Sequence, residues 1–457
     1  MNFFDTTIKT LAGIVWGPHM AVLLLGAGIF LTFRLKFIQV RKFPLAVSLA
    51  FGPKRRGEEA GKKQGDITPF QAMSTSLAGV IGNGNIAGVC TAIAMGGPGS
   101  VFWMWLCAFF GMATKLVEAL LGQHFKKLQP DGSTAGGPMY YIREGLGLPW
   151  LAGLFAFFMG CKPLFSTTTI QSNSIALALE TQFGITPWIT GIGLALLTWL
   201  VIIGGIRSIA RVTEWLSPIM VLLYVAGAFI TIMLFASKIP AAFGLIFQGA
   251  FNPTAIGGGI AGATVARAIR YGLSRGAYSN EAGSGTAAVF HAPARTEEPV
   301  QQSLIATLDV FIDTIIICTL TALAVLVTGV WTTGTSTEMT VAAFNSALPG
   351  LGGLIVVSSS FLFGYSSLIA TPYYGEIAFS SLLGVWIKKP YRWMVCLVIF
   401  VGAVLEVEVA WSIGDFFNGM MVLTNLIGIL GLSALATRLV RDYFNRFPAG
   451  KGSVSGR

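Results

Sequence analysis

Apolar runs recur along almost the whole chain, and most are at least as long as the roughly twenty residues that a helix needs to cross a bilayer. Short polar or basic stretches separate them. The pattern predicts spans over residues 11–33, 67–95, 99–121, 150–179, 187–204, 214–236, 249–264, 301–330, 350–384, 391–410 and 411–437. We therefore expect an all-α integral membrane protein with about eleven transmembrane helices.

The second of these spans is interrupted at its centre by glycine and asparagine, within Leu77–Gly88. Glycine weakens a helix by about 1 kcal/mol, and asparagine competes for its backbone hydrogen bonds. In lipid such an interruption is tolerated only where protein or a water-filled cavity surrounds it. Freed backbone amides and carbonyls at membrane depth suit a small ion and a charged solute. This stretch therefore predicts the binding site of a transporter.

A second interrupted span, with glycines at 257–259 and 262, occupies the matching place in the second half of the chain. Without the first span, the remaining ten divide into two sets of five near residue 240. Interrupted spans at matching positions indicate inverted repeats with the solute site between them. We expect four regions, namely an N-terminal transmembrane helix with a basic cytoplasmic loop, a first repeat, a second repeat and a basic cytoplasmic tail, over 1–66, 67–240, 241–440 and 441–457.

Two other interpretations compete for the first glycine-rich stretch. Gly82, Gly84 and Gly88 resemble a nucleotide-binding loop. That loop needs a preceding strand and an acidic residue about twenty positions later, and no acidic residue follows within that distance. A close helix contact through Gly84 and Gly88 is compatible with the spacing. Helix packing alone does not require Asn83 and Asn85 at membrane depth.

Composition supports a membrane protein and the charges fix its expected orientation. The chain is 54% hydrophobic and 11% charged, less than half of the roughly 25% that is usual in soluble domains. Its net charge of +10 comes from Lys and Arg clusters between the apolar runs, so it indicates topology and excludes a nucleic-acid partner. The clusters predict an external N-terminus and a cytoplasmic C-terminus in the cell (inner) membrane. The 5 Cys and 3 His are scattered, which argues against disulfides and a metal cluster.

Several motifs resemble the alanine/glycine:cation symporter family. They are Gly96–Trp105, Arg275–Gly285, Ile81–Gly88 and Ala135–Tyr140, and the resemblance covers nearly the whole chain. It implies sodium-coupled uptake of a small neutral amino acid on a leucine-transporter-like fold. Sodium is then the coupling ion, and no cofactor is implied.

The implied solute is a zwitterion, which needs donors for its carboxylate and acceptors for its ammonium group. Freed amides around Asn83, Gly84 and Asn85 are expected to supply the donors. Freed carbonyls near Gly258 and Gly259, next to Gly257, are expected to accept from the ammonium group. A close helix crossing is the alternative role for this second glycine run.

The resemblance also assigns roles to side chains on two other spans. It points to Gln171 as a pocket residue. Ser366 and Ser367 match a hydroxyl pair with which this fold class holds sodium against carbonyls of the first broken helix, here near Ile81. Thr371 shares a helix face with Ser367 and stands where family members often carry tryptophan, so we expect a roomier pocket that also admits serine or glutamine.

Five ionisable residues lie within predicted spans, where such groups are functional candidates. Lys115 and Glu118 share a helix face and are expected to form an ion pair. Asp309 and Asp313 also share a face and are expected near the inner end, partly hydrated. Lys162 has no acid at helical spacing, so it snorkels, pairs with another helix, or places a positive charge near the cation site.

Other classes of function stay open to test. An intramembrane enzyme needs positioned catalytic groups, and no such motif stands out. A channel is disfavoured because no repeated filter loop is present. Within transport, proton coupling through Lys162 or an aspartate is the main alternative to sodium. The expected partners are the amino acid, sodium and the lipid bilayer, and the sequence does not indicate an oligomeric state.

Overall fold

The protein is described by a computed structural model that covers residues 3–52, 65–251, 265–405 and 408–448. The described chain is almost wholly helical, with one small hairpin in which β1 (Lys127–Leu128) pairs antiparallel with β2 (Thr134–Ala135). The α-helices are α1 Phe3–Val15, α2 Pro18–Arg34, α3 Ile38–Arg41, α4 Phe43–Phe51, α5 Pro69–Val80, α6 Val89–Gly96, α7 Ser100–His124, α8 Pro138–Gly145, α9 Pro149–Lys162, α10 Thr168–Phe183, α11 Pro187–Ile202, α12 Gly205–Leu234, α13 Ile239–Phe251, α14 Val265–Asn280, α15 Thr286–His291, α16 Pro299–Val310, α17 Thr319–Thr328, α18 Thr337–Ala347, α19 Gly352–Leu383, α20 Lys388–Val404, α21 Glu408–Gly431 and α22 Ser433–Arg446. Three π-helices are η1 Gly84–Gly88, η2 Pro163–Thr167 and η5 Phe311–Cys318, and three short 3-10 helices are η3 Ala236–Lys238, η6 Val330–Thr332 and η7 Val385–Ile387.

Helix length and hydropathy confirm a multispanning membrane protein. Among the described residues, 7 helices are long and apolar enough to cross a membrane, and the bent pair α5 with η1–α6 raises the number to 8. Three further segments, α11, the α14–α15 pair and α20, fall outside that criterion because they are shorter or more charged. The helices α11 and α20 coincide with the spans predicted at 187–204 and 391–410, whereas α14 and α15 follow the predicted span 249–264.

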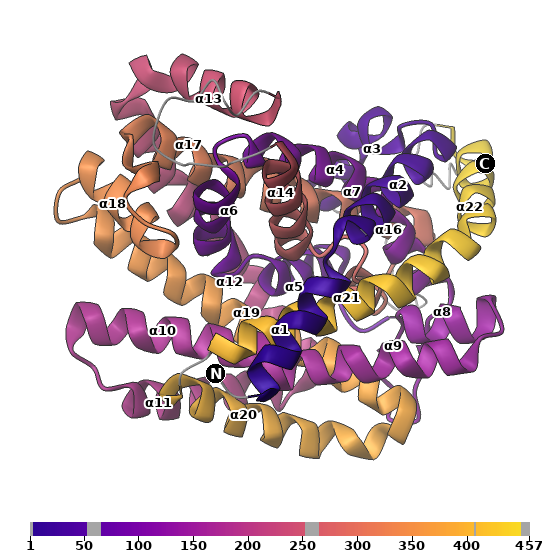
Figure 1. Ribbon diagram of the computed structural model, residues 1–457. Coiled ribbons are helices and arrows are strands. Elements are labelled where there is room, and N and C mark those ends of the chain that lie inside the picture. The colour runs from indigo at the N-terminus through magenta and orange to yellow at the C-terminus, as the bar shows by residue number, and fades with distance from the viewer. Residues whose placement is uncertain (1–2, 53–64, 252–264, 406–407, 449–457) are drawn as a thin grey trace.

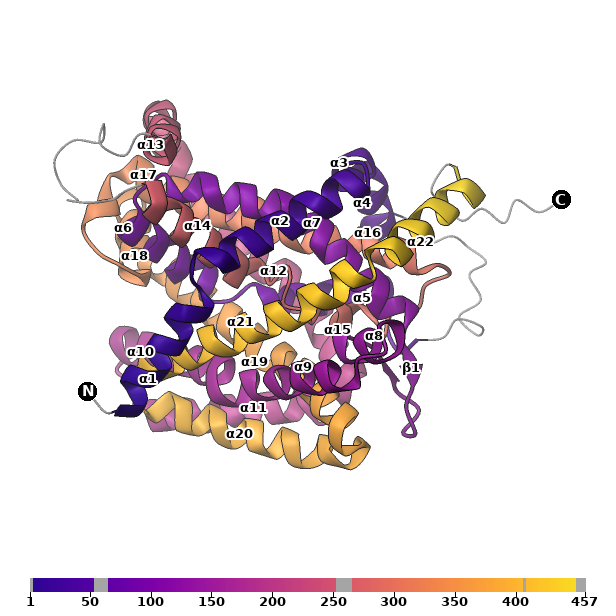
Figure 2. The same cartoon turned by 45° about the vertical axis from the view of Figure 1, so that its right-hand side comes forward.

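Figure 1 shows α11 and α20 along the lower side of the molecule and α13 and α3 along the upper side. In Figure 2 the long helices α7, α20 and α21 run lengthwise across the view. The helix α1 starts at one end, where α13 and α18 also lie, while α22 lies at the other end with α8 and the β1 hairpin. The molecule therefore has two distinct ends joined by the spanning helices.

The first broken helix consists of α5, a non-helical step at residues 81–83, and η1 followed by α6. The two halves meet at an angle of 56°. A capping box fixes the start of α5, because Thr68 accepts from the Gln71 amide while the Gln71 side chain accepts from the Thr68 amide. The interruption predicted within Leu77–Gly88 is thus confirmed.

A second broken helix is present in the described chain. The break expected at Gly257–Gly259 lies outside the described residues and stays a prediction. In the described chain, α14 ends at Asn280 and α15 begins at Thr286, so the interruption falls at 281–285. Gly283 and Gly285 have φ of +95° and +84°, a backbone conformation that glycine adopts most readily. Residues 265–280 of this charged segment form the helix α14, which packs against α7.

The two broken helices lie side by side in opposite directions. Next to the start of α5, Ile67 forms a parallel bridge with Ala294, just beyond α15, and the Asp66 amide donates to the Pro293 carbonyl at 2.8 Å. At the other end, α6 finishes against α14, where a Cβ on Gly96 would lie 3.1 Å from that of Tyr271. This antiparallel arrangement is the one expected of paired elements in an inverted repeat.

Candidate functional site

The step at residues 81–83 brings three helices to one point. Gly82 lies so close to neighbouring helices that an added Cβ would be 2.8 Å from the Gln171 Nε2 atom and 3.1 Å from the Ser367 hydroxyl. Its amide donates to the Asn85 Oδ1 atom at 3.0 Å, so one freed backbone donor is satisfied within the break. Glycine is required here because α10 and α19 approach the backbone itself.

Asn83 and Gln171 form the polar centre of this region. The Asn83 Nδ2 atom donates to the Gln171 Oε1 atom at 2.9 Å, and the Ser360 hydroxyl donates to the Asn83 Oδ1 atom at 2.6 Å. All three side chains are buried. The structure therefore brings together the two side chains predicted for the solute pocket, on the first broken helix and on α10. It adds Ser360 of α19, which the sequence analysis did not select.

Four oxygen atoms converge where α19 passes α5. The Ser367 Oγ atom lies 3.3 Å from each of the Ala78 and Ile81 carbonyl oxygens, and the Ser366 Oγ atom lies 3.2 Å from the Ala78 oxygen. Both hydroxyls also bond to the Phe363 carbonyl of their own helix. Sodium is a hard cation that prefers oxygen ligands, as other hard cations do. The structure thus places Ile81, Ser366 and Ser367 together, while their role in binding sodium stays a prediction.

The remaining predicted pocket residues take different positions. Thr371 is buried one turn beyond Ser367, and its hydroxyl donates to the Ser367 carbonyl at 2.8 Å. Gly84 begins η1 and faces the Tyr278 ring, with a hypothetical Cβ 3.8 Å from it. Gly258 and Gly259 lie outside the described residues.

Asn85 points away from Asn83 into a second polar cluster around Asp313. Its Nδ2 atom lies 2.5 Å from the Asp313 Oδ1 atom and 3.0 Å from the Ser279 Oγ atom. Ser279 and Thr314 also donate to the other Asp313 oxygen, at 2.9 and 2.7 Å. The prediction that Asp313 is partly hydrated near the inner end is wrong, because it is fully buried beside the first break. Its position inside an apolar span was the available signal for this role.

The three alternatives for Lys162 resolve into an ion pair with another helix segment. Its Nζ atom lies 2.5 Å from the Glu281 Oε1 atom and 3.0 Å from the Asn418 Oδ1 atom. Thr286 donates to the second Glu281 oxygen at 2.8 Å. Glu281 has φ of +53°, an uncommon conformation for a residue other than glycine. The pair therefore fixes the second break against α9 and α21.

Lys115 and Glu118 do not form the ion pair that their spacing predicts. The Lys115 ammonium group donates instead to the Asn280 carbonyl at 2.9 Å. Glu118 accepts from the Gly285 amide at 3.1 Å and from Asn425 at 2.7 Å. Both residues are fully buried. They hold the two sides of the second break to α7, which explains why two charges are kept inside this span.

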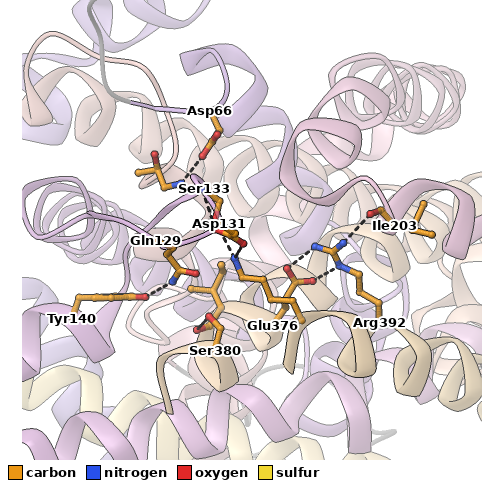
Figure 3. A network of polar contacts seen from close by, with 12 residues as sticks. Asp66, Gln129, Asp131, Ser133, Tyr140, Ile203, Glu376, Ser380 and Arg392 are labelled. Atoms are coloured by element: carbon orange, nitrogen blue, oxygen red, sulfur yellow. Dashed lines mark hydrogen bonds and ion pairs between the residues drawn. The ribbon is translucent and has the colours of Figure 1, made fainter. Parts of the chain in front are cut away.

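A network of charged groups closes the end of the molecule that carries the hairpin (Figure 3). Asp66 accepts from the Arg207 guanidinium at 2.8 Å and from the Thr134 amide at 2.6 Å. Within the hairpin loop, Asp131 lies 2.6 Å from the Lys388 ammonium group. Partial burial alone would raise the pKa of Asp131, but hydrogen bonds from Lys388 and Ser133 outweigh it and lower that pKa to about 2.

The same network lines a cavity of about 240 Å³. On its other side, Arg392 of α20 makes two bonds to Glu376 of α19, at 2.6 and 2.7 Å, and a third to the Ile203 carbonyl. The contacts join the segment before α5, the hairpin, α12, α19 and α20. At the end of the molecule that carries the hairpin, the scaffold and the start of the first broken helix are therefore tied together by ion pairs.

This bundle, with two antiparallel broken helices meeting at a buried polar site, defines a secondary transporter with a leucine-transporter-like fold. A solved manganese transporter from Eremococcus coleocola shares the fold, with a TM-score of 0.51 and 12% identity over 87% of this chain and 86% of that chain. The sodium:alanine symporter family matches residues 1–455, and the chain belongs to that family.

Relatives within the family are similar over nearly their full length. The sodium/alanine symporter AgcS of Methanococcus maripaludis is 43% identical over 94% of this chain and 95% of its own. GlnT of Bacillus subtilis, named a probable sodium/glutamine symporter, is 36% identical over 96% of this chain and 91% of its own. The chain is therefore a multi-pass membrane transporter for amino acids and not an enzyme.

Proposed function

We propose that the protein imports a small neutral amino acid of the alanine and glycine class together with sodium, by alternating access. The observation that carries this proposal is the set of four oxygens from Ala78, Ile81, Ser366 and Ser367, which spans the first break and α19. The Asn83–Gln171 pair next to it offers an amide donor and acceptors for a zwitterion. Family membership supports the same class of transport.

The arrangement of the chain supports two related proposals. We propose that residues 67–240 and 241–440 form inverted repeats, which the opposite directions of the two broken helices support. We also propose that the N-terminus lies outside the cell and the C-terminus in the cytoplasm of a cell (inner) membrane. The start of α1 and the end of α22 at opposite ends of the molecule support this orientation.

Uptake into proteoliposomes under separately imposed gradients tests the proposed coupling. With equal pH on both sides, an inward sodium gradient is expected to accumulate labelled alanine above its external concentration. A proton gradient without sodium is expected to give no accumulation. Accumulation driven by the proton gradient alone would favour a proton-coupled permease instead, and recovery of a chemically altered solute would indicate an enzyme.

The size of the solute pocket gives a separate prediction. Thr371 is buried one turn from Ser367, so a tryptophan there is expected to fill space next to the proposed ion site. One methylene group changes selectivity by about 1–3 kcal/mol, and this replacement is far larger. In the natural protein, serine and glutamine are expected to compete with alanine for uptake. In Thr371→Trp they are expected to compete at least about tenfold less well, which corresponds to a loss of about 1.4 kcal/mol of binding free energy.

Competition by glycine, serine, glutamine and leucine measures this preference, with Thr371→Ser as the control that keeps a small hydroxyl side chain. If only alanine and glycine compete, and Thr371→Trp leaves the order unchanged, the larger-pocket proposal is wrong.

A further inference from the structure

A buried histidine–aspartate pair lies away from the proposed ion and solute sites. The His291 Nε2 atom lies 2.9 Å from the Asp309 Oδ2 atom, and the Ser76 hydroxyl donates to the same oxygen at 2.5 Å. On the other side of the ring, the Gln302 Nε2 atom lies 2.7 Å from the His291 Nδ1 atom. The four side chains are buried, and those of His291 and Asp309 are 0% exposed.

The cluster joins three elements that the fold places at the inner end of the broken helices. Ser76 belongs to α5, His291 ends α15, and Gln302 and Asp309 lie on α16. It is thus a point where the inner halves of both broken helices contact the same scaffold helix. The transport proposal gives no role to these four side chains.

Two polar atoms of the cluster have no hydrogen-bond partner within the described part of the chain. They are the Asp309 Oδ1 atom and the Gln302 Oε1 atom, and both are buried. A buried polar atom without a partner costs about 1–3 kcal/mol, so two in one cluster suggest that the network has a second hydrogen-bonded arrangement. In the arrangement seen here, Nε2–H of neutral His291 donates to the Asp309 carboxylate, and its Nδ1 atom accepts from Gln302.

In the described structure, the ion-pair contact of Asp309 is with His291. On α7, Lys115 and Glu118 bond to Asn280 and Gly285, and His124 is exposed. Beyond α7 and α15, Lys126 donates to Gln123 and to the Ala294 carbonyl, and Arg295 donates to the Gly65 carbonyl. Asp313 bonds to Asn85, and Glu376 bonds to Arg392.

The remaining neighbouring helices add no partner to the pair. On α22, Arg438 is exposed, while Arg441 pairs with Asp442 and Arg446 with Glu298. The helices α4 and α5 carry no charged residue. The imidazole of His291 and the carboxylate of Asp309 are therefore each other's ionisable partner in this cluster.

We propose that the His291–Asp309 pair is a proton-binding site that sets the rate of sodium-driven transport. A proton from water adds to the Nδ1 atom of His291 and gives an imidazolium ion against the Asp309 carboxylate. The Gln302 amide then turns by about 180°, and its Oε1 atom accepts the new N–H, so an atom without a partner gains one. No bond other than N–H forms, and no electron is transferred.

Proton binding changes how firmly the inner halves of the broken helices are held. In the protonated state an ion pair joins α15 to α16, and Ser76 remains hydrogen-bonded to the same carboxylate from α5. In the neutral state only hydrogen bonds remain. Because alternating access requires such elements to move, proton occupancy is expected to favour the closed inner end.

Nitrogen-15 spectroscopy of the purified protein tests proton binding without any transport assay. The chain has 3 His, and the other two, His19 and His124, are exposed. With labelled histidine, the ring signals that remain in the His19→Gln/His124→Gln variant belong to His291. Spectra are recorded from about pH 5 to 8, and these signals are expected to change when a proton adds to the ring. Signals that stay constant over this range would overturn the proposal, whether or not the protein transports alanine.

Uptake measurements then test the consequence, which rests on the proposed transport function. At equal pH on both sides of the vesicle, sodium-driven alanine uptake is expected to change at least about fivefold between pH 5 and 8, the lower end of usual coupling effects. The His291→Gln variant is expected to lose most of this dependence, and His124→Gln to keep it. An identical pH profile in His291→Gln and the natural protein would show that the pair does not control transport. Absence of uptake at every pH would contradict the transport function alone, since the spectroscopic result stands by itself.

Discussion

Lys162→Met is expected to lower the stability of the folded protein by about 3–5 kcal/mol, the usual cost of removing one partner of a buried ion pair. Glu281 would keep its bond from Thr286 but lose its only ion-pair partner among the described residues. Its charge would then remain buried at the second break, where the backbone already has an unfavourable φ. The midpoint of thermal unfolding in detergent measures the loss.

Two comparison variants give this prediction its control. Lys389→Met makes the same chemical change at an exposed position and is expected to leave the midpoint nearly unchanged. Lys162→Met/Glu281→Gln removes both charges and is expected to recover much of the stability, because the cost arises from an unpaired charge. A Lys162→Met protein as stable as Lys389→Met would show that the pair does not hold the break.

Ser367→Ala is expected to raise the sodium concentration for half-maximal alanine uptake at least about tenfold. Loss of even an outer-shell partner of a metal site typically reduces affinity about 10–100-fold, and Ser367 is proposed to contact the ion itself. Its hydroxyl approaches two carbonyls of the broken helix and one of its own helix. The change removes one oxygen and little volume, so folding should be affected much less. Initial uptake rates over a range of sodium concentrations measure the effect.

Ser380→Ala is the matched control for this prediction. Ser380 lies on the same helix, and its hydroxyl bonds only to the Ile377 carbonyl of that helix. The sodium dependence of alanine uptake by Ser380→Ala is expected to equal that of the natural protein. If Ser367→Ala shows the same sodium dependence as Ser380→Ala, the four oxygens do not form the coupling site.

The first half of the site could be predicted because its signal is local. Glycine and asparagine interrupt an apolar run at 81–85, and lipid tolerates such a sequence only inside protein. The pairing of Asn83 with Gln171, and of Ile81 with Ser367, could be expected from family motifs on separate spans. The sequence did not indicate Ser360, because serines in a spanning helix usually bond to their own backbone, and nothing distinguishes Ser360 from its neighbours Ser358 and Ser359.

The break at 281–285 could not be found from hydropathy because the segment around it is charged. Arginine at 267, 270 and 275 and glutamate at 281, just beyond α14, make this segment look like a hydrophilic connection. The groups that accept these charges inside the protein are distant in sequence, as Lys162 is from Glu281. A glycine-rich run nearby, at 257–259, offered a more apolar alternative. Hydropathy alone cannot show that a buried charge has its partner more than a hundred residues away.

The same limit explains the other charged residues inside the spans. Spacing placed Lys115 and Glu118 on one face, and this is correct, but shared spacing does not decide whether side chains bond to each other or to a third segment. Here both are bound by the backbone around the second break. Asp313 was similarly identified as unusual, while its contact with Asn85 depends on how η5 packs against η1.

The π-helices have a consequence for how the family's sequences are aligned and how insertions within it arise. A π-helical turn holds more residues than an α-helical turn, so each such segment behaves as a local one-residue insertion. Gln171 lies in the first turn of α10, just after η2, and deletion of one residue from Pro163–Thr167 would turn it by about 100° around the axis of α10. A relative with an uninterrupted α-helix at this place would need a single gap in the alignment. Without that gap, Gln171, which accepts from Asn83, would be aligned with the residue next to its true counterpart in the relative.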